Sequence, residues 1–373
     1  MQPTLRAAPP GGRGRSTFAD CLPLLILAVA LTGCASDREA SPGSSAGSPP
    51  PTTSASPALV PSASVTTSVG STYRNPVYPL DFPDPHILTA GTAYYAYATN
   101  AATANVPVIR STDLARWERI GDALPALPTW AVPNFGYTWA PGVIEVDGAF
   151  VLFFVARDAE SDRQCVGVAR AETPEGPFVS DAPAPLVCQV ELGGSIDPYP
   201  FRNVDGRLLL YWKNDGNCCA KPVGLWVQPL AADGLSLAGA PVELIRRDQP
   251  WEIPLIENPA MVSTDGRYYL FYSANRWDSF EYAVGYALCE TATGPCEKPL
   301  EGPIFAFTPE VMGPGGQAFF TDLEGNLWMA YHAWTGPQVG YPAGARSLRL
   351  EPVGFADGAP VIRGPTTDPQ ALP

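Results

Sequence analysis

Short runs of alternating bulky apolar and polar residues recur along the chain from about residue 71 onward. In each run a dipeptide ending in proline is followed by a few residues, a tight turn with glycine, and a strand rich in bulky apolar residues. The five versions are DPHILTAGTAYYAYAT, APGVIEVDGAFVLFFVA, DPYPFRNVDGRLLLYWKN, NPAMVSTDGRYYLFYSA and GPGGQAFFTDLEGNLWMAYHA. Alternation with a period of two indicates β-strands, and an Asp-Gly-type turn between two such runs indicates a hairpin. The pattern therefore predicts five copies of a β-hairpin.

The five copies recur at intervals of roughly 58 residues, which is enough for four short strands each. Their marker prolines are Pro85, Pro141, Pro198, Pro259 and Pro314, and their turn glycines are Gly91, Gly148, Gly206, Gly266 and Gly325. Further strand-like runs follow the hairpins, as at residues 165–171 and 282–288. We therefore predict an all-β fold, a five-bladed β-propeller. Bulky residues of the second strands are expected to form the core between blades: Tyr95, Phe153, Leu209 and Tyr269.

Composition and charge narrow the class of protein. The chain has 43 prolines and 35 glycines among 373 residues, which argues against a helical bundle because interior prolines break helices. Its formal net charge is -14, and its lysines are Lys213, Lys221 and Lys298. Because a protein with this much negative charge repels the phosphates of nucleic acids, we expect no nucleic-acid partner. Neutral polymers such as polysaccharides remain open as partners.

The first 33 residues have the features of a secretory signal peptide. Three arginines precede an apolar run from Leu22 to Leu31, which is about half the length needed to span a membrane. The run ends in Leu-Thr-Gly followed by Cys34, which resembles the lipobox of bacterial lipoproteins. This resemblance implies an extracytoplasmic protein, anchored by a lipid on Cys34 to the outer face of the cell membrane. Ordinary secretion is the alternative.

Residues 34–70 are predicted to be a disordered linker. They consist mainly of Ser, Thr, Pro, Ala and Gly and contain no aromatic residue, so they bury too little apolar surface to offset the entropy of ordering. The predicted organisation is a lipoprotein-type signal peptide at 1–33, the linker at 34–70, and the propeller at 71–373. We expect a monomer.

Six cysteines fall within the predicted propeller, and export makes disulfides plausible. Fifteen pairings are possible from the sequence alone. We favour Cys165–Cys188 and Cys289–Cys296, because each pair brackets what looks like neighbouring strands. Cys218 and Cys219 are then left as a vicinal pair. Zinc-type spacing is absent, and the chain has only 2 histidines.

Three carboxylates occupy matched or adjacent positions in three predicted blades. Asp84 and Asp197 directly precede their marker prolines, and Glu257 lies one residue before Asn258, which holds that position in the fourth blade. Because the first strand of each blade lines the axis of a propeller, we expect the three side chains to meet in one funnel. A single Asp before Pro often only starts a turn. Three clustered carboxylates raise one another's pKa, and such clusters serve acid–base chemistry or metal binding. The apolar and aromatic residues around them favour acid–base chemistry.

The motifs around these positions resemble glycoside hydrolase family 43, whose members are five-bladed propellers that cleave α-L-arabinofuranosides and β-D-xylosides. They are FPDPHI around Asp84, TWAPGV around Trp139, SIDPYPF around Asp197 and IENPAMV around Glu257. The resemblance covers about residues 73–368. It implies an enzyme that hydrolyses O-glycosidic bonds of arabinose- or xylose-containing plant polysaccharides or oligosaccharides.

The resemblance also implies a role for each carboxylate. Asp84 matches the general base that activates water, and Glu257 matches the general acid. Asp197 matches the third carboxylate, which raises the pKa of the acid and orients it. In this scheme an ionised Asp197 keeps Glu257 protonated near neutral pH. Family members invert the anomeric centre in a single displacement.

Three further residues are candidates for substrate binding. Trp139 occupies the repeat position of Glu257, so its ring could stack on a sugar, and Phe82 is a similar candidate. A place in the core is the alternative reading for Trp139. Arg346 precedes the terminal strand, where some relatives place an arginine on the substrate. A solvated arginine is the alternative there. Asn214 and Asp215 follow the aromatic strand of the third blade, and the sequence does not decide whether they reach the rim.

The sequence departs from the family at one place. Many members carry a glycine-rich motif in the fifth blade that ends in a histidine, which helps to hold a central calcium or sodium ion. Gly316 stands where that histidine would be, and no other histidine is close in sequence. We therefore expect no metal and no cofactor. Gln317 is a candidate for the axial polar network, and His332 on the following strand is expected to be structural.

Two other functions remain in view. Retaining five-bladed fructan enzymes carry an Asn-Asp-Pro-Asn motif and a Glu-Cys motif, whereas Asp84 follows Phe-Pro and Glu257 is followed by Asn258. A non-catalytic sugar-binding surface lipoprotein is compatible with a tether, but the complete set of three carboxylates is not expected of a pure binder. The sequence leaves open arabinose or xylose, and exo or endo action.

Overall fold

The computed structural model describes residues 72–372 except 102 and 134–136. The expected signal peptide, the linker and the lipidated Cys34 lie outside these residues. Within the described residues the helical elements are the short 3-10 turns η1 (Val190–Leu192), η2 (Gly216–Cys219) and η3 (Pro250–Glu252). No helix in this part of the chain has the length and apolar character of a membrane span.

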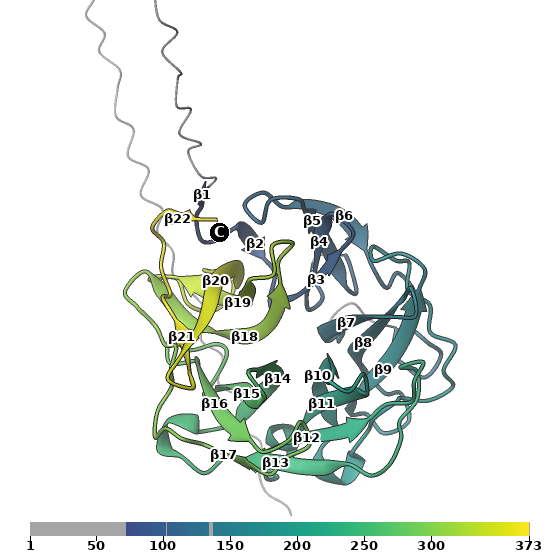
Figure 1. Cartoon of the computed structure of the whole chain (residues 1–373). Coiled ribbons are helices and arrows are strands. Elements are labelled where there is room, and N and C mark those ends of the chain that lie inside the picture. Colours follow the sequence, from purple (N-terminus) through teal and green to yellow (C-terminus); the bar gives the residue numbers. More distant parts are fainter. Residues whose placement is uncertain (1–71, 102, 134–136, 373) are drawn as a thin grey trace, which may run out of the picture. The chain divides into compact units, whose positions relative to one another are not determined.

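Five antiparallel sheets stand around a central axis as the blades of a propeller (Figure 1), which confirms the predicted fold. The first two blades are β3 (His86–Ala90), β4 (Ala93–Tyr97), β5 (Pro107–Ser111) and β6 (Glu118–Asp122), then β7 (Trp139–Val146), β8 (Ala149–Arg157) and β9 (Gln164–Ala171). The third blade is β10 (Ser195–Arg202), β11 (Leu208–Asn214), β12 (Gly224–Pro229) and β13 (Val242–Arg246). The fourth is β14 (Ile256–Thr264), β15 (Arg267–Ala274), β16 (Ala283–Cys289) and β17 (Cys296–Glu297).

The fifth blade closes the ring by combining both ends of the domain. It contains β18 (Val311–Thr321), β19 (Leu327–Thr335) and β20 (Ser347–Ala356), with β2 (Tyr78–Asp81) as the fourth strand and β21 (Ala359–Ile362) paired to β20. Strand β1 (Thr72–Tyr73) pairs with β22 (Gln370–Ala371). Asn75 reinforces this closure, since its side chain exchanges two hydrogen bonds with the backbone of Leu350, at 2.8 and 2.9 Å. Because β2 belongs to the last blade, Asp84 lies where the chain crosses from the fifth blade into the first.

The innermost strands β7, β10, β14 and β18 have a bulge at equivalent places, and the chain just before β3 has the same backbone conformation. The residues that take a positive φ there are Asp84 (53°), Ala140 (40°), Asp197 (56°), Asn258 (54°) and Gly316 (60°). In the first four, the marker proline follows, and it has no N–H to contribute to the ladder. A bulge re-aims the side chains next to it, which explains how an inner strand can present a carboxylate to the funnel.

The fifth copy corrects the sequence alignment. Strand β18 has two register shifts, and the second lies between Gly315 and Ala318. This second shift contains Gln317, which lies three residues beyond Pro314, the proline chosen from the pattern. Gln317, not Pro314, therefore lines the small axial cavity together with the four other marker prolines. The extra residues that made this copy fit least well are accommodated by the additional bulge.

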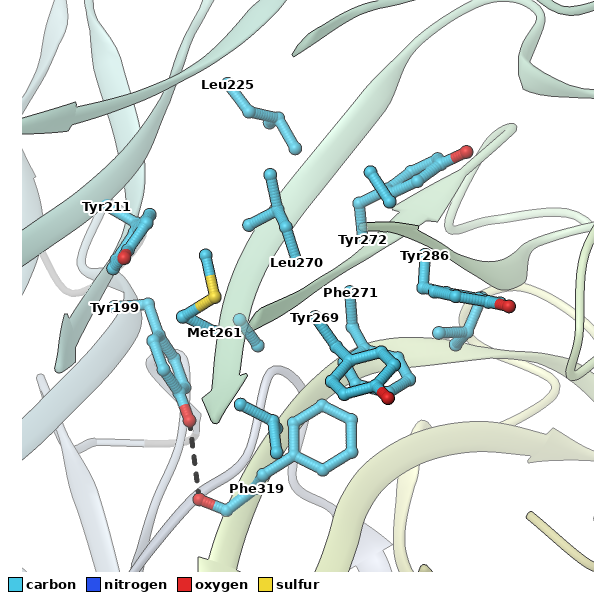
Figure 2. Packing of buried hydrophobic residues seen from close by; sticks show 14 of the residues in the cluster. Tyr199, Tyr211, Leu225, Met261, Tyr269, Leu270, Phe271, Tyr272, Tyr286 and Phe319 are labelled. Carbon is cyan, nitrogen blue, oxygen red and sulfur yellow. Dashed lines mark hydrogen bonds between the residues drawn. The ribbon is translucent and has the colours of Figure 1, made fainter. Parts of the chain in front are cut away.

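The core lies between the blades. Phe153, Leu209 and Tyr269 are at most 2% exposed, as expected, and Tyr95 is half-buried against the cluster of the first two blades. Figure 2 shows the cluster that joins the third, fourth and fifth blades. There the rings of Phe271 and Phe319 have centroids 4.4 Å apart. Full burial of one such side chain contributes roughly 2 kcal/mol, so these contacts hold the blades at fixed angles.

All six cysteines of the propeller are paired. The bonds are Cys165–Cys188, Cys218–Cys219 and Cys289–Cys296, which confirms the favoured pairing. Cys289–Cys296 joins directly opposite residues of β16 and β17. The vicinal bond lies within η2, beside the funnel.

Candidate active site

Asp84, Asp197 and Glu257 line one cavity of about 610 Å³ at the beginning of the inner strands. The three carboxylates thus meet although they come from different blades. The other lining residues are Thr99, Trp139, Ile196, Lys213, Asp215, Asn217, Cys218, Pro254, Leu255, Asn258, Arg276, Trp277, Asp278, Tyr282 and Arg346.

The second strands add a ring of side chains beneath these carboxylates. Backbone pairing places one residue per blade opposite the position just before the bulge: Thr99, Val155, Lys213, Ser273 and His332. The five positions are equivalent, yet each carries a different side chain. Two of these side chains donate hydrogen bonds to carboxylates of the site, Thr99 to Asp84 and Lys213 to Glu257.

Asp84 is held by polar contacts from three elements. Thr99 Oγ1 donates a hydrogen bond of 2.5 Å to Asp84 Oδ2, and Arg346 Nη1 lies 3.7 Å from Oδ1. The backbone N–H of Asp84 donates to His332 Nδ1 at 3.0 Å. Burial, followed by the charge of Arg346, lowers the pKa of His332 well below its usual range, so the ring is neutral and Nδ1 acts as an acceptor. The sequence analysis expected His332 to be structural, and the structure places it against Asp84.

Glu257 receives two hydrogen bonds. Lys213 Nζ donates to Oε2 at 2.9 Å, and the hydroxyl of Tyr282 donates to Oε1 at 2.9 Å. Lys213 has no exposed surface. Burial opposes its charge, but the carboxylates of Glu257, Asp197 and Asp215 together raise the pKa of Lys213 above its ordinary value. Sequence reasoning named neither donor, because each lies outside the inner-strand motifs.

Asp197 carries the largest carboxyl shift at the site. Burial, and then the charge of Glu257, raise the pKa of Asp197 to about 8, although Lys213 and the N–H of Asn258, which donates to Oδ2 at 3.0 Å, act in the opposite direction. Near neutral pH the free site therefore holds a proton on Asp197. The sequence argument placed this proton on Glu257 with Asp197 ionised. In the structure, burial and the neighbouring charge of Glu257 instead favour Asp197 as the group that holds a proton.

Asp215 is a further acidic residue in the cavity, and it is 7% exposed. Burial raises the pKa of Asp215 to about 6, with the charge of Lys213 opposing the shift. This residue follows β11 and directly precedes η2, so no inner-strand motif marks it. The Asn-Asp pair after the third aromatic strand was the only signal in the sequence.

The three predicted substrate-binding residues lie in different environments in the structure. Trp139 is half-buried and lines the cavity, and Arg346 is buried and also lines it, so Arg346 is not a solvated surface residue. Phe82 is 1% exposed and belongs to the core, where its ring meets that of Tyr78 with centroids 5.5 Å apart. The prediction for Phe82 was wrong because the chain around it packs into the fifth blade.

Trp277 is an aromatic residue that the sequence analysis missed. It follows β15, outside the repeat, and lines the cavity with its side chain 37% exposed. The guanidinium carbon of Arg346 lies 4.3 Å from its ring centroid, and Trp334 stacks on it at 6.4 Å. A fixed, partly exposed indole of this kind provides a stacking surface for an apolar sugar face.

Position 316 does not fit the histidine that the family resemblance places there. A Cβ on Gly316 would lie 2.4 Å from the ring of His332 and 2.9 Å from Asp84 Oδ1. His332 thus fills this space from the second strand. Gln317 takes part in the axial polar network, because its side chain accepts from Ser273 Oγ at 2.6 Å and donates to the carbonyl of Asn258 at 2.9 Å. In the described part of the chain, no three His, Cys, Asp or Glu side chains are grouped as metal ligands.

A five-bladed propeller with several carboxyl groups in one funnel has the features of a glycoside hydrolase, which uses paired carboxyl groups around the scissile bond. Comparison with known proteins agrees. Residues 73–360 match the model of glycosyl hydrolases family 43, and the chain belongs to this family. It is therefore a glycoside hydrolase.

The sequence identity between the chain and individual known proteins is low. The chain is 27% identical over 279 residues to beta-D-galactofuranosidase xynD of Aspergillus niger, covering 70% of this chain and 74% of that protein. It is 27% identical over 304 residues to a xylosidase/arabinosidase of Butyrivibrio fibrisolvens, covering 78% of this chain but only 56% of that protein. Among solved structures, a thermostable family-43 glycoside hydrolase matches with a TM-score of 0.72 and 31% identity, over 80% of this chain and 98% of the other.

Proposed function

We propose that this protein hydrolyses O-glycosidic bonds of arabinose- or xylose-containing plant polysaccharides or oligosaccharides in one inverting step. The observation that carries the proposal is the convergence of Asp84, Asp197 and Glu257, from three blades, in one cavity. The names of relatives support the sugar class, since they include a xylosidase/arabinosidase and a probable arabinan endo-1,5-alpha-L-arabinosidase.

In the proposed reaction Asp84 acts as the general base. It takes a proton from a water molecule, whose oxygen forms a bond to the anomeric carbon while the bond to the leaving oxygen breaks. Thr99 and Arg346 orient the carboxylate for this step. Glu257 donates a proton to the leaving oxygen. Inversion follows because water attacks from the face opposite the leaving group.

Asp197 and Glu257 supply the proton together. Two buried carboxylates in close proximity do not both ionise near neutral pH, so one proton stays with the pair. The raised pKa of Asp197 favours its carboxyl group as the holder of this proton in the free site. The proton moves to Glu257 as the leaving oxygen approaches, and the Asn258 N–H then stabilises the ionised Asp197. After the step, Lys213 and Tyr282 stabilise the Glu257 carboxylate.

The charges at the rim favour a neutral sugar. Arg276 is bound by both oxygens of Asp278, at 2.9 and 2.6 Å, and Arg346 faces Asp84 and Tyr341. These cations are therefore already paired within the protein. Trp139 and Trp277 offer apolar faces to the same cavity, as sugar stacking requires.

No step of the proposed reaction uses a metal ion, because the His332 ring occupies the space beside Gly316. It also places the enzyme outside the cytoplasm as a monomer, anchored through Cys34 or otherwise secreted. The support for this location is the basic, apolar and Leu-Thr-Gly-Cys sequence of the first 34 residues.

A panel of aryl α-L-arabinofuranoside, aryl β-D-xyloside and linear arabinan tests the function. Asp84→Asn and Glu257→Gln should each lower kcat by about a thousandfold or more on a substrate with a poor leaving group. Glu257→Gln should recover much of this loss on a substrate with an activated aryl leaving group, because such a group departs without protonation. Asp84→Asn should not recover. The exposed Asp181→Asn is the matched control. Activity like the wild type in either cavity variant would refute the roles.

A further inference from the structure

Asp215 is a buried acidic residue of the cavity, and the proposed reaction gives it no role. Asp215 is 7% exposed, and it lines the cavity that holds Glu257. Among the described residues, neither of its carboxylate oxygens has a hydrogen bond or an ion pair. Burying an acidic group without a partner is costly. The three catalytic carboxyl groups, by contrast, each have a hydrogen-bond donor.

The backbone around Asp215 is held on several sides. Its N–H donates to the carbonyl of Gly194 at 3.1 Å, and its carbonyl accepts from the N–H of Cys218 at 3.3 Å. A Cβ on Gly193 would lie 2.4 Å from the Asp215 carbonyl oxygen, so these two segments are in close contact. The vicinal disulfide of Cys218 lies in the same turn. The backbone that carries this carboxylate is therefore held in place before any ligand arrives.

Asp215 lies on the acid side of the cavity. Its charge couples to Lys213 and Glu257, which are themselves in contact at 2.9 Å. Asn217 and Cys218 continue the same wall. Glu257 is the group that protonates the leaving oxygen in the proposed reaction, so the leaving sugar must lie near this wall.

We propose that Asp215 binds the hydroxyl groups of the leaving-group sugar and thereby determines specificity for glycosyl, rather than aryl, leaving groups. This assignment rests on the proposed glycosidase function. A carboxylate with two free oxygens accepts hydrogen bonds from two neighbouring sugar hydroxyls, and such charge-assisted bonds are among the strongest in recognition. An aryl leaving group has no hydroxyls in these positions.

The test compares two substrates that share the same non-reducing sugar, such as 4-nitrophenyl β-D-xyloside and xylobiose, or the arabinoside pair if the wild type prefers it. Asp215→Ala should lower kcat/KM for the disaccharide by about 10- to 100-fold and lower that for the aryl glycoside at most a few-fold. Asp215→Asn keeps the shape of the side chain and should show the same bias with a smaller loss. Asp181→Asn, an exposed site outside the cavity, should leave both values unchanged.

The outcomes separate this assignment from its alternatives. Equal losses on both substrates would mean that Asp215 acts only through the charge of Lys213 on the chemistry, and this would overturn the assignment alone. No loss on the disaccharide would overturn it as well. If the wild type hydrolyses no glycoside, the proposed function fails and the assignment falls with it. Isothermal titration calorimetry with xylobiose measures binding without turnover when both proteins carry Glu257→Gln. In that background, Asp215→Asn should weaken the binding of xylobiose.

Discussion

Lys213 is a fully buried cation that links carboxyl groups from different parts of the ring. It contacts Glu257 directly, and its charge also acts on Asp197 and Asp215. A buried charge of this kind is tolerated because its partners compensate for lost hydration. Its effect on Asp197 is to lower a pKa that burial and Glu257 raise. In the proposed reaction, Lys213 therefore lowers the pH at which the acid pair loses its proton.

Replacing Lys213 by Met should move the basic limb of the pH profile. In the wild type, the limb should fall near pH 8, because Asp197 holds the proton of the pair with a pKa of about 8. Without the positive charge, ionisation of the pair becomes less favourable, so its pKa rises and kcat/KM persists to higher pH. Measurement of kcat/KM from pH 5 to 10 checks this. A limb that stays in place or moves to lower pH would count against the proton assignment.

The control is Arg116→Met, which removes one positive charge from a side chain that is 90% exposed. Its profile should match that of the wild type. A general loss of activity in Lys213→Met with an unchanged profile would show a packing role alone.

At the scale of strands, the sequence predicted the hairpins that all blades share. It missed the second-strand side chains that differ from blade to blade. Alternation and turn glycines identified the hairpins, and the residue before each proline identified Asp84 and Asp197. The fifth blade broke the rule because β18 has a second bulge, which moved the equivalent position from Gly313 to Gly316. Lys213 and His332 were missed as site residues because their importance comes from pairing across strands, which no inner-strand motif records.

Gly316→Ala tests the close packing of β18 against β19 and Asp84. The added methyl group would meet the His332 ring at 2.4 Å and Asp84 Oδ1 at 2.9 Å, so His332 and Asp84, the proposed base, must shift. We expect kcat to fall by about 10- to 100-fold, since small displacements of a catalytic group carry large costs.

Gly266→Ala is the matched control for this substitution. Gly266 also has a positive φ, of 72°, but nothing lies within 4 Å of an added Cβ. It should lose about 1 kcal/mol of stability through backbone strain and keep its kcat. Comparison of kcat and Tm for the two variants separates strain from displacement. Full activity of Gly316→Ala would contradict the arrangement described for this site.

At the scale of the whole molecule, the ring closes through a buried polar cluster as well as through β2. Glu351 in β20 accepts hydrogen bonds from Asn75 at 3.2 Å, Tyr331 at 3.1 Å and the N–H of Thr366 at 3.3 Å. It thus joins the first and last segments of the propeller. Closure could not be predicted from the hairpin pattern, because β2 precedes the first repeat and pairs with the last.

Glu351 should make the fold more stable in mild acid than in mild base. Burial raises its pKa from 4.5 to about 7, so the folded protein holds a proton that the unfolded chain releases. Its contribution to stability is therefore fully present below pH 4.5 and is lost as pH rises through 7, by roughly 3 kcal/mol at most.

Glu351→Gln removes this titration while keeping an acceptor. Between pH 5 and 8, the free energy of unfolding should fall more in the wild type than in Glu351→Gln, as measured by urea denaturation at each pH. Parallel pH dependence in the two proteins would show that Glu351 does not titrate in this range.

The central claim is that carboxyl groups delivered by separate blades act together on one bond, with Asp84 directing water and Glu257 protonating the leaving oxygen. Proton NMR of the first product formed, recorded within minutes on the preferred xyloside or arabinoside, tests it most directly. The account predicts that the newly formed sugar initially has the anomeric configuration opposite to that of the substrate. Initial formation of the sugar with the substrate's own configuration would require a covalent intermediate and would contradict the account.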